Sequence, residues 1–185
     1  MNWKNILLII LILSIGSFLT WWLLPKINSS EWKTHEDNIY GLELKYPSDW
    51  NLWDRNEGYM FTMFSPWTEK QIDSRDGSYF PALEIRKLKT FEDIEEDAFV
   101  YQKEVIEQLY SNMRDSEISY FIEEGEIDGS PAVLVRINDN LAETTEYWVV
   151  RDFERYLISY FFPINQPEYK STFQEMIDSF RFLEQ

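Results

Sequence analysis

The chain has 185 residues, with thirty-three acidic and seventeen basic side chains and a net charge of −16 at neutral pH. Nucleic-acid binding needs clustered lysine and arginine, so this balance excludes nucleic acid as a partner and disfavours an anionic lipid surface. The chain contains no cysteine, which excludes disulfides, thiolate chemistry and a lipid-modified cysteine anchor. Cations and basic proteins are compatible with the charge.

An apolar segment, Ile6 to Leu24, lies near the start of the chain and contains no ionisable side chain. As a helix, its nineteen residues would span about 28 Å, close to the hydrocarbon thickness of a bilayer. Tryptophans mark both ends of the segment, as is typical of membrane interfaces: Trp3, Trp21 and Trp22. We therefore expect a transmembrane signal anchor over residues 1–26 and a juxtamembrane linker over residues 27–38.

The flanks of this segment bear on its processing and orientation. A cleaved signal peptide would have a shorter apolar region and small residues at its cleavage site, whereas Trp21-Trp22-Leu23-Leu24 occupies that position here, which favours an uncleaved anchor. Lys4 before the segment is balanced by Lys26 and Lys33 after it, so charge alone does not assign the side of the membrane. We expect a single-pass protein with its folded domain outside the cytoplasm, partly on a family resemblance.

The folded part of the chain, residues 39–185, is long enough for one domain with a substantial core. The polar segment Trp32 to Asn38 before it has no apolar period and is expected to be a hinge. From Leu42 apolar and polar residues alternate, which predicts a strand that ends at Pro47, because proline lacks the N–H that continues a ladder. Two further strands are predicted, with a polar surface loop from Thr68 to Tyr79 between them: Tyr59–Ser65 and Ala82–Leu88.

A helix is predicted over Phe91–Met113, with Thr90 as its N-terminal cap. Its apolar side chains recur at spacings of three and four residues: Ile94, Ala98, Tyr101, Val105 and Leu109. Acidic side chains fill the first turns, where they look like a metal cluster but also stabilise the positive end of the helix dipole. We favour the dipole interpretation.

Four consecutive strands are predicted after this helix: Ile118–Glu124, Ala132–Asn138, Thr145–Val150 and Arg155–Phe162. The turns between them are short, apart from a longer polar loop at Asp139–Thr144, so neighbouring strands should pair antiparallel as a meander. A closing helix is predicted after Pro167, and Phe180-Arg181-Phe182 should extend as a last short segment. This order predicts an α+β domain with a mainly antiparallel sheet covered by helices.

The side chains present argue against catalysis. The single histidine, His35, lies in the expected hinge and is interpreted as solvated, since no second histidine or cysteine completes a zinc site. The chain has no nucleophile elbow and no glycine-rich phosphate or dinucleotide loop. We predict that the protein is not an enzyme, and we identify no catalytic or cofactor-binding residue.

Two groups of residues remain as candidates for a binding site. The densest acidic stretch could gather a hard cation such as calcium, although it contains no Asp-x-Asp-x-Asp-Gly loop: Glu123, Glu124, Glu126 and Asp128. Two tryptophans are expected in loops bordered by polar residues, where they would form an exposed surface for a partner: Trp53 and Trp67.

Three motifs carry a family resemblance. The first, Gly41-Leu42-Glu43-Leu44-Lys45-Tyr46-Pro47-Ser48-Asp49-Trp50, combines a glycine, an alternating strand and Tyr-Pro-x-x-Trp. The second is Ile127-Asp128-Gly129-Ser130-Pro131-Ala132, and the third is Met176-Ile177-Asp178-Ser179-Phe180-Arg181-Phe182. Together they resemble the opening strand, Asp-Gly-x-Pro-Ala hairpin and Ser-Phe ending of the PsbP-like family, named for the accessory subunit of photosystem II.

The resemblance covers roughly residues 39 to 183 and bears mainly on the fold. It implies an α-β-α sandwich on a central, mainly antiparallel sheet, here preceded by one transmembrane helix. It also implies a noncatalytic accessory or binding module, often outside the cytoplasm. No residues of this chain match a metal or catalytic motif of the family.

These observations favour a membrane-anchored, noncatalytic accessory domain that acts outside the cytoplasm through protein–protein contacts. A sensor or scavenger of a cation or small ligand is the alternative that the acidity and the loop aromatics support. A carboxylate-dependent hydrolase is a third hypothesis, which requires a cleft holding two acids with opposed pKa shifts.

Overall fold

A computed structural model describes residues 31–38, 40–55, 61–68, 80–88, 97–112 and 118–184. The anchor expected over Ile6 to Leu24 lies outside these ranges, as do Thr90 and most of the predicted loop from Thr68 to Tyr79. Within the described ranges, no helix is both long and apolar enough to cross a membrane.

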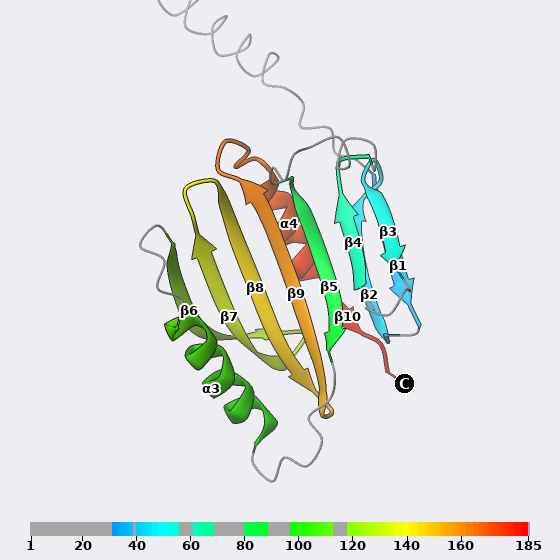
Figure 1. Ribbon diagram of the computed structural model, residues 1–185. Coiled ribbons are helices and arrows are strands. Elements are labelled where there is room, and N and C mark those ends of the chain that lie inside the picture. The colour runs from blue at the N-terminus through cyan, green and yellow to red at the C-terminus, as the bar shows by residue number, and fades with distance from the viewer. Residues whose placement is uncertain are drawn as a thin grey trace, which may run out of the picture. The chain divides into compact units, whose positions relative to one another are not determined.

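The described residues form ten strands and two helices (Figure 1). The strands are β1 (Trp32–Asp37), β2 (Leu42–Pro47), β3 (Asn51–Arg55), β4 (Phe61–Ser65), β5 (Ala82–Leu88), β6 (Ser119–Ile127), β7 (Ser130–Asn138), β8 (Ala142–Arg151), β9 (Glu154–Pro163) and β10 (Arg181–Phe182). The helices are α3 (Ala98–Ser111) and α4 (Tyr169–Ser179).

The strands form two antiparallel sheets. The smaller has the order β1-β2-β10, and the larger has the order β3-β4-β5-β9-β8-β7-β6. Strands β6 to β9 are neighbours in chain order, which confirms the predicted meander. Each is longer than predicted, and β8 already begins at Ala142, so the expected loop at Asp139–Thr144 is shorter than predicted.

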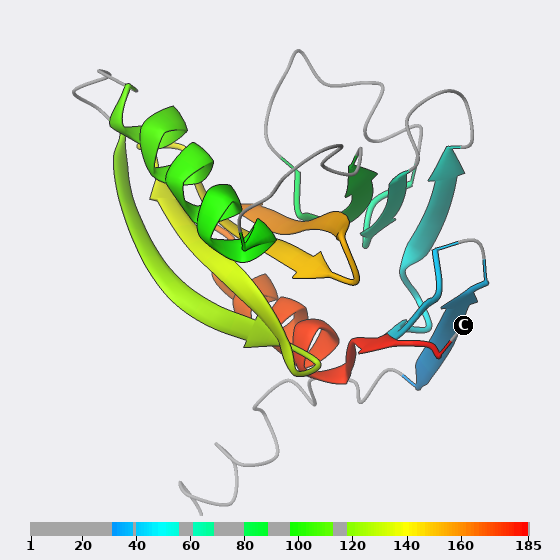
Figure 2. The ribbon, with the colours of Figure 1, turned by 90° about the horizontal axis from the view of Figure 1, so that it is seen from below.

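Helices α3 and α4 cover opposite faces of the large sheet (Figures 1 and 2). Successive side chains of a strand point to opposite faces, so one strand can serve both layers. On β7, Ala132 and Leu134 join the α4-side core, whereas Val133 and Val135 pack with α3. The expected α+β class and mainly antiparallel sheet are confirmed.

The α4-side core is rich in aromatic rings and includes side chains of both sheets. Phe173 of α4 is fully buried and lies parallel to the ring of Tyr160, with 5.2 Å between the ring centroids. Trp50, which follows β2, packs edge-on against the ring of Phe173, with 5.2 Å between the ring centroids. Offset and edge-to-face aromatic packing adds to the free energy of burial.

The prediction of a hinge at Trp32–Asn38, which is part of the predicted linker, is wrong for most of these residues. These residues form β1, which pairs with β2 from Trp32↔Pro47 to Asp37↔Leu42. As an edge strand, β1 buries little side-chain surface, so no apolar alternation marks it. His35 is therefore not a solvated hinge residue, because its half-buried ring packs edge-on against Phe64 at 5.6 Å.

Helix α3 begins later than predicted. Asp97 has extended backbone angles and its carboxylate accepts hydrogen bonds from the N–H groups of Phe99 (2.9 Å) and Val100 (3.4 Å). An aspartate that satisfies two free N–H groups is a favoured helix start. Asp97 rather than Thr90 therefore caps α3. The other acidic residues predicted to fill its first turns lie outside the described residues.

The buried face of α3 also differs from the predicted stripe. Gln102, Ile106 and Tyr110 are buried, each one position after Tyr101, Val105 and Leu109. One residue rotates a helix face by about 100°. Because Gln102 is polar, the spacing of the buried residues was not recognisable as an apolar pattern in the sequence. Leu109, which was predicted to be on the buried face, is 46% exposed.

Replacing Phe173 tests the aromatic core. We expect Phe173→Ala to lower the free energy of unfolding by about 3–5 kcal/mol, because it leaves a cavity where Trp50 meets the rings of Tyr160 and Phe162 on β9. Urea denaturation followed by tryptophan fluorescence measures this change. Phe121→Ala is the matched control, since Phe121 is 58% exposed and should change stability by no more than about 0.5 kcal/mol. Equal effects of the two substitutions would contradict this account of the core.

Candidate functional site

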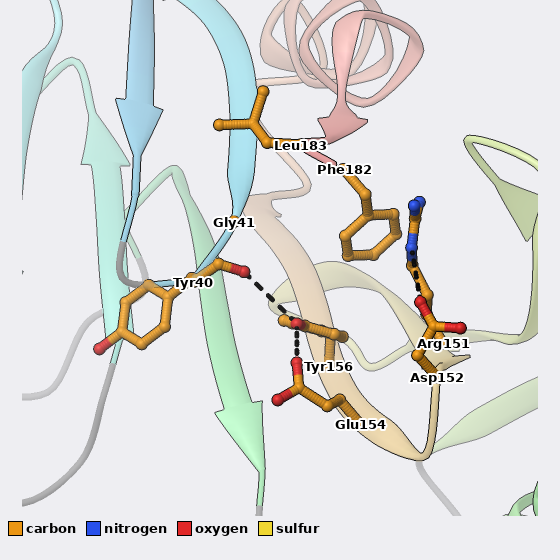
Figure 3. Close-up of a pocket in the computed structure, with 8 residues that line it drawn as sticks. All are labelled: Tyr40, Gly41, Arg151, Asp152, Glu154, Tyr156, Phe182 and Leu183. Atoms are coloured by element: carbon orange, nitrogen blue, oxygen red, sulfur yellow. Dashed lines mark hydrogen bonds and ion pairs between the residues drawn. The ribbon is translucent and has the colours of Figure 1, made fainter. Parts of the chain in front are cut away.

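A pocket of about 280 Å³ opens where the β8–β9 hairpin meets β2 and β10 (Figure 3). This volume is close to the lower end of the range for small-molecule sites, about 300 Å³. Three segments that are distant in sequence line the pocket: Tyr40, Gly41, Arg151, Asp152, Glu154, Tyr156, Phe182 and Leu183.

Tyr156 forms the centre of the pocket wall. Its hydroxyl donates a hydrogen bond to Glu154 Oε2 (2.5 Å) and lies 3.4 Å from the carbonyl oxygen of Tyr40, as Figure 3 shows. Its ring packs against Phe182 at 5.0 Å. Burial, followed by the hydrogen bond and charge of Glu154, raises the pKa of Tyr156 well above its ordinary value. The phenol therefore stays protonated and acts as a hydrogen-bond donor.

Glu154 is one of two carboxylates that line the pocket. Burial alone would raise the pKa of Glu154, but hydrogen bonds from Lys87 and Tyr156 outweigh burial and hold this pKa below its ordinary value. The hydrolase hypothesis instead requires a carboxylic acid that stays protonated beside an ionised one. The second acid of the pocket, Asp152, has an 89% exposed side chain 3.5 Å from Arg151. The pocket therefore does not supply an acid–base pair.

Arg151 connects the pocket to the neighbouring hairpin. Its guanidinium lies 4.8 Å from the centre of the Phe182 ring and 3.8 Å from the Asp128 carboxylate. Asp128 in turn accepts a hydrogen bond from the Phe182 N–H (2.8 Å) and lies 3.7 Å from Arg181. Asp128 thereby holds β10 against the turn between β6 and β7.

Two hairpin turns of this region have the same backbone geometry and different sequences. Asp128 and Gly129 have φ angles of 48° and 72°, and Asp152 and Phe153 have φ angles of 49° and 65°. Positive φ at both central residues defines a type I′ turn, which favours glycine at the second position. A phenylalanine with positive φ is strained by roughly 1–2 kcal/mol, because its Cβ approaches the following carbonyl oxygen. Phe153 is also 76% exposed, so burial does not offset the strain.

The four acidic candidates do not converge on one point. Glu123 and Glu124 point to opposite faces of β6, as neighbouring residues of a strand must. Glu123 pairs with Arg136 (2.6 Å), Glu124 pairs with Lys103 (2.6 Å), and Asp128 is engaged by β10. The described part of the chain contains no group of three or more histidine, cysteine or acidic side chains arranged to hold a metal. This geometry gives the calcium hypothesis no support.

The two tryptophan candidates do not lie in exposed loops. Trp67 is only 9% exposed and stacks on Phe80, with 6.1 Å between ring centroids. The backbone N–H of Trp67 donates a hydrogen bond to Ser65 Oγ (3.1 Å), just after the end of β4. Trp53 belongs to β3 and is half-buried. The expectation of an exposed Trp67 is therefore wrong, and Trp53 is misassigned to a loop.

Sequence reasoning missed the pocket and its rim. The available signal was Asp152-Phe153, a short connection between two strands without the glycine that such turns favour. The partners of Tyr156, by contrast, come from the segment before β2, from β10 and from the hairpin, so no local sequence pattern includes all of them.

Comparison with known proteins bears on the fold. No protein-family profile matches the chain, and no sequence match to a curated protein is found. Among solved structures, the solution structure of cyanobacterial PsbP (CyanoP) from Synechocystis sp. PCC 6803 matches with a TM-score of 0.54. That match covers 85% of this chain and 95% of the other, at 13% identity. The chain has a PsbP-like fold.

A crystal structure from Bacteroides thetaiotaomicron VPI-5482 also matches, with a TM-score of 0.51 and 12% identity. The match covers 83% of this chain but only 49% of the other protein, so this chain spans about half the length of that protein. At such identities the likeness shows the fold alone. The PsbP-like motif Asp128-Gly129 lies at the β6–β7 turn that anchors β10.

The strain at Phe153 is testable by substitution. We expect Phe153→Gly to raise the free energy of unfolding by about 1 kcal/mol, because glycine adopts positive φ without a clash. Phe153→Ala keeps the strained Cβ and should change stability by no more than about 0.5 kcal/mol. Urea denaturation of the three proteins measures the difference. A clear loss of stability in Phe153→Gly would show that the ring contributes to folding.

The raised pKa of Tyr156 predicts a loss of stability in alkali. Its ordinary value is 10.0 and its folded value is higher, so the stabilisation is complete below about pH 10 and declines as the pH rises through the folded-state pKa. We expect the unfolding free energy of the wild type to fall more steeply above about pH 10 than that of Tyr156→Phe, which has no phenol to ionise. Identical pH profiles in urea denaturation would refute the assignment.

Proposed function

We propose that this PsbP-like domain is a noncatalytic accessory module that is anchored to a membrane through Ile6 to Leu24 and binds another protein outside the cytoplasm. The observation that carries the proposal is Phe153, an exposed aromatic side chain on strained backbone at the rim of the pocket. The Asp128-Gly129 turn of the same chain shows what folding alone favours at this position. A residue that is unfavourable for folding points to a role in the bound state.

The surroundings of Phe153 have the composition of a binding surface. Protein interfaces concentrate their binding energy in a few aromatic and arginine side chains inside a polar rim. Here the exposed Phe153 follows Arg151 and Asp152 in the hairpin turn, and the pocket that these two residues line also includes Tyr156 and Phe182. A partner side chain that enters the pocket while the partner covers Phe153 would use both features.

A small-ligand sensor is the second candidate function, and the pocket volume of about 280 Å³ favours it. The residues that line the pocket would then hold a small molecule. The two functions differ in what covers Phe153, since a macromolecule would contact its exposed ring from solvent and a ligand confined to the pocket would not.

Site-specific photocrosslinking distinguishes these functions. We expect a photoreactive side chain at position 153 to crosslink to one discrete protein in native membranes. Position 141 is the control, because Leu141 is 66% exposed but lies at the other end of β8. With the purified partner, Asp152→Lys should weaken binding by about tenfold, whereas Glu107→Lys on α3 should leave it within about twofold. A co-purifying small molecule with no crosslink at position 153 would favour the sensor.

The anchor is tested by fractionation. We expect the full chain to stay with membranes after an alkaline carbonate wash, and a variant lacking residues 1–26 to be released, because the apolar segment is long enough to span the bilayer. Protease added outside intact cells should digest the domain if it lies outside the cytoplasm. Recovery of a mature chain without the apolar segment in the soluble fraction would contradict the anchor.

A further inference from the structure

Strand β6 forms one edge of the large sheet, and no other described strand pairs with its outer side. Its nine residues pair with β7 in one unbroken register, from Ser119↔Asn138 to Ile127↔Ser130. The strand therefore has no bulge, and alternate residues direct their backbone N–H and C=O groups away from the sheet. Such an edge is able to accept a further strand.

A groove of about 310 Å³ runs beside this edge, between β6 and α4. Leu134 and Tyr147 of the neighbouring strands line it on one side, and Gln174 and Ile177 of α4 line it on the other. The groove and the hairpin pocket share no lining residue. They are separate candidate surfaces of the domain.

Gly125 lies inside β6, two residues before its end, and lines this groove. Its φ is not among the positive values, so the backbone conformation does not require glycine. A Cβ at this position would meet only Leu134 Cβ, at 4.0 Å, which is an ordinary contact. Glycine inside a strand is unfavourable for folding and often marks a place where another backbone approaches closely. At Gly125 the missing side chain leaves the groove open.

The charges around the groove define the chemistry of an occupant. Five carboxylates line the groove together with the cation Arg181: Glu123, Glu124, Glu126, Asp128 and Asp178. Glu123, Glu124 and Asp128 already have cations beside them, whereas no ion pair of the described residues includes Glu126 or Asp178. A second copy of β6 would place like charges across the new strand pair, which is destabilising. A segment with lysine or arginine would complement these carboxylates and the net charge of −16.

We propose that the β6 edge and its groove bind an extended, basic segment of a partner protein, which adds a strand to the large sheet. Backbone hydrogen bonds to β6 provide the pairing. A small or apolar side chain of the segment sits over Gly125, and its basic side chains point to the opposite face of the sheet, beside Glu126. This surface does not depend on the hairpin pocket, and it remains available if Phe153 binds nothing.

A peptide of alternating lysine and valine residues, as long as β6, is the probe. Its binding to the full-length chain is measured by fluorescence anisotropy at low salt. We expect the same peptide with alternate backbone amides methylated to lose binding by at least about tenfold, because its charge is kept but the strand hydrogen bonds are blocked. Equal binding of the two peptides would overturn strand addition.

Two pairs of protein variants locate the site. Valine is favoured in strands, so Gly125→Val should keep β6 intact while its side chain fills the groove, and it should weaken binding about tenfold. Gly125→Ala should have a smaller effect. Glu126→Lys should weaken binding by about fivefold, and Glu36→Lys on β1 of the small sheet, where the side chain is exposed, should not. Amide exchange monitored by NMR should show protection of alternate β6 N–H groups on binding. Unchanged affinity in Gly125→Val, or unchanged exchange in β6, would refute the proposal.

One further variant separates this surface from the proposed function. Asp152→Lys alters the rim of the hairpin pocket and should leave peptide binding within about twofold of the wild type. Loss of peptide binding in Asp152→Lys would mean that the peptide occupies the hairpin pocket, which would overturn the β6 site and leave the proposed function standing.

Discussion

The arrangement of the domain depends on the packing of α4 against both sheets. Phe173 lies within an aromatic group that includes Trp50, which follows β2, and Tyr160 of β9. The same core includes Leu42 of the small sheet and Phe182 of β10. This packing brings β2 and β10 beside the β8–β9 hairpin, and the hairpin pocket lies at that junction. An interaction that stabilises the fold thus also creates the cavity.

The two candidate surfaces share a physical signature, which is a residue that folding alone disfavours. Phe153 occupies a left-handed turn position without being buried, and Gly125 interrupts a regular strand without needing positive φ. Natural sequences agree with their local structure at most positions. Exceptions without a compensating contact inside the fold are the positions where binding offers an explanation.

Electrostatics acts differently at the two surfaces. In the hairpin pocket the charges are already engaged, since Glu154 is held by Lys87 and Tyr156, and Arg151 lies over Phe182 beside Asp128. Recognition there would depend mainly on aromatic contact. Along β6 the acidic side chains outnumber the basic ones, and no ion pair of the described residues includes Glu126, so complementary charge would matter for steering and orientation. Salt should therefore weaken binding at the β6 edge more than at the pocket.

The sequence by itself determined the elements whose signal is local. Alternation predicted β2 and β5, the spacing of turn residues predicted the β6–β9 meander, and three short motifs indicated the PsbP-like fold. The sequence did not predict the elements whose apolar pattern is weak or misleading. Strand β1 has no apolar alternation because it is an edge, and the buried Gln102 displaced the predicted face of α3 by one residue.

Only the tertiary structure decided which residues form sites. The acidic candidates are adjacent in sequence, but strand geometry sends neighbours to opposite faces, so they form no cation site among the described residues. Conversely, Tyr40, Tyr156 and Phe182 come together because β2, β9 and β10 pack around α4. Local patterns reflect backbone geometry over a few residues, whereas a pocket depends on contacts between distant segments, and packing alone brings these together.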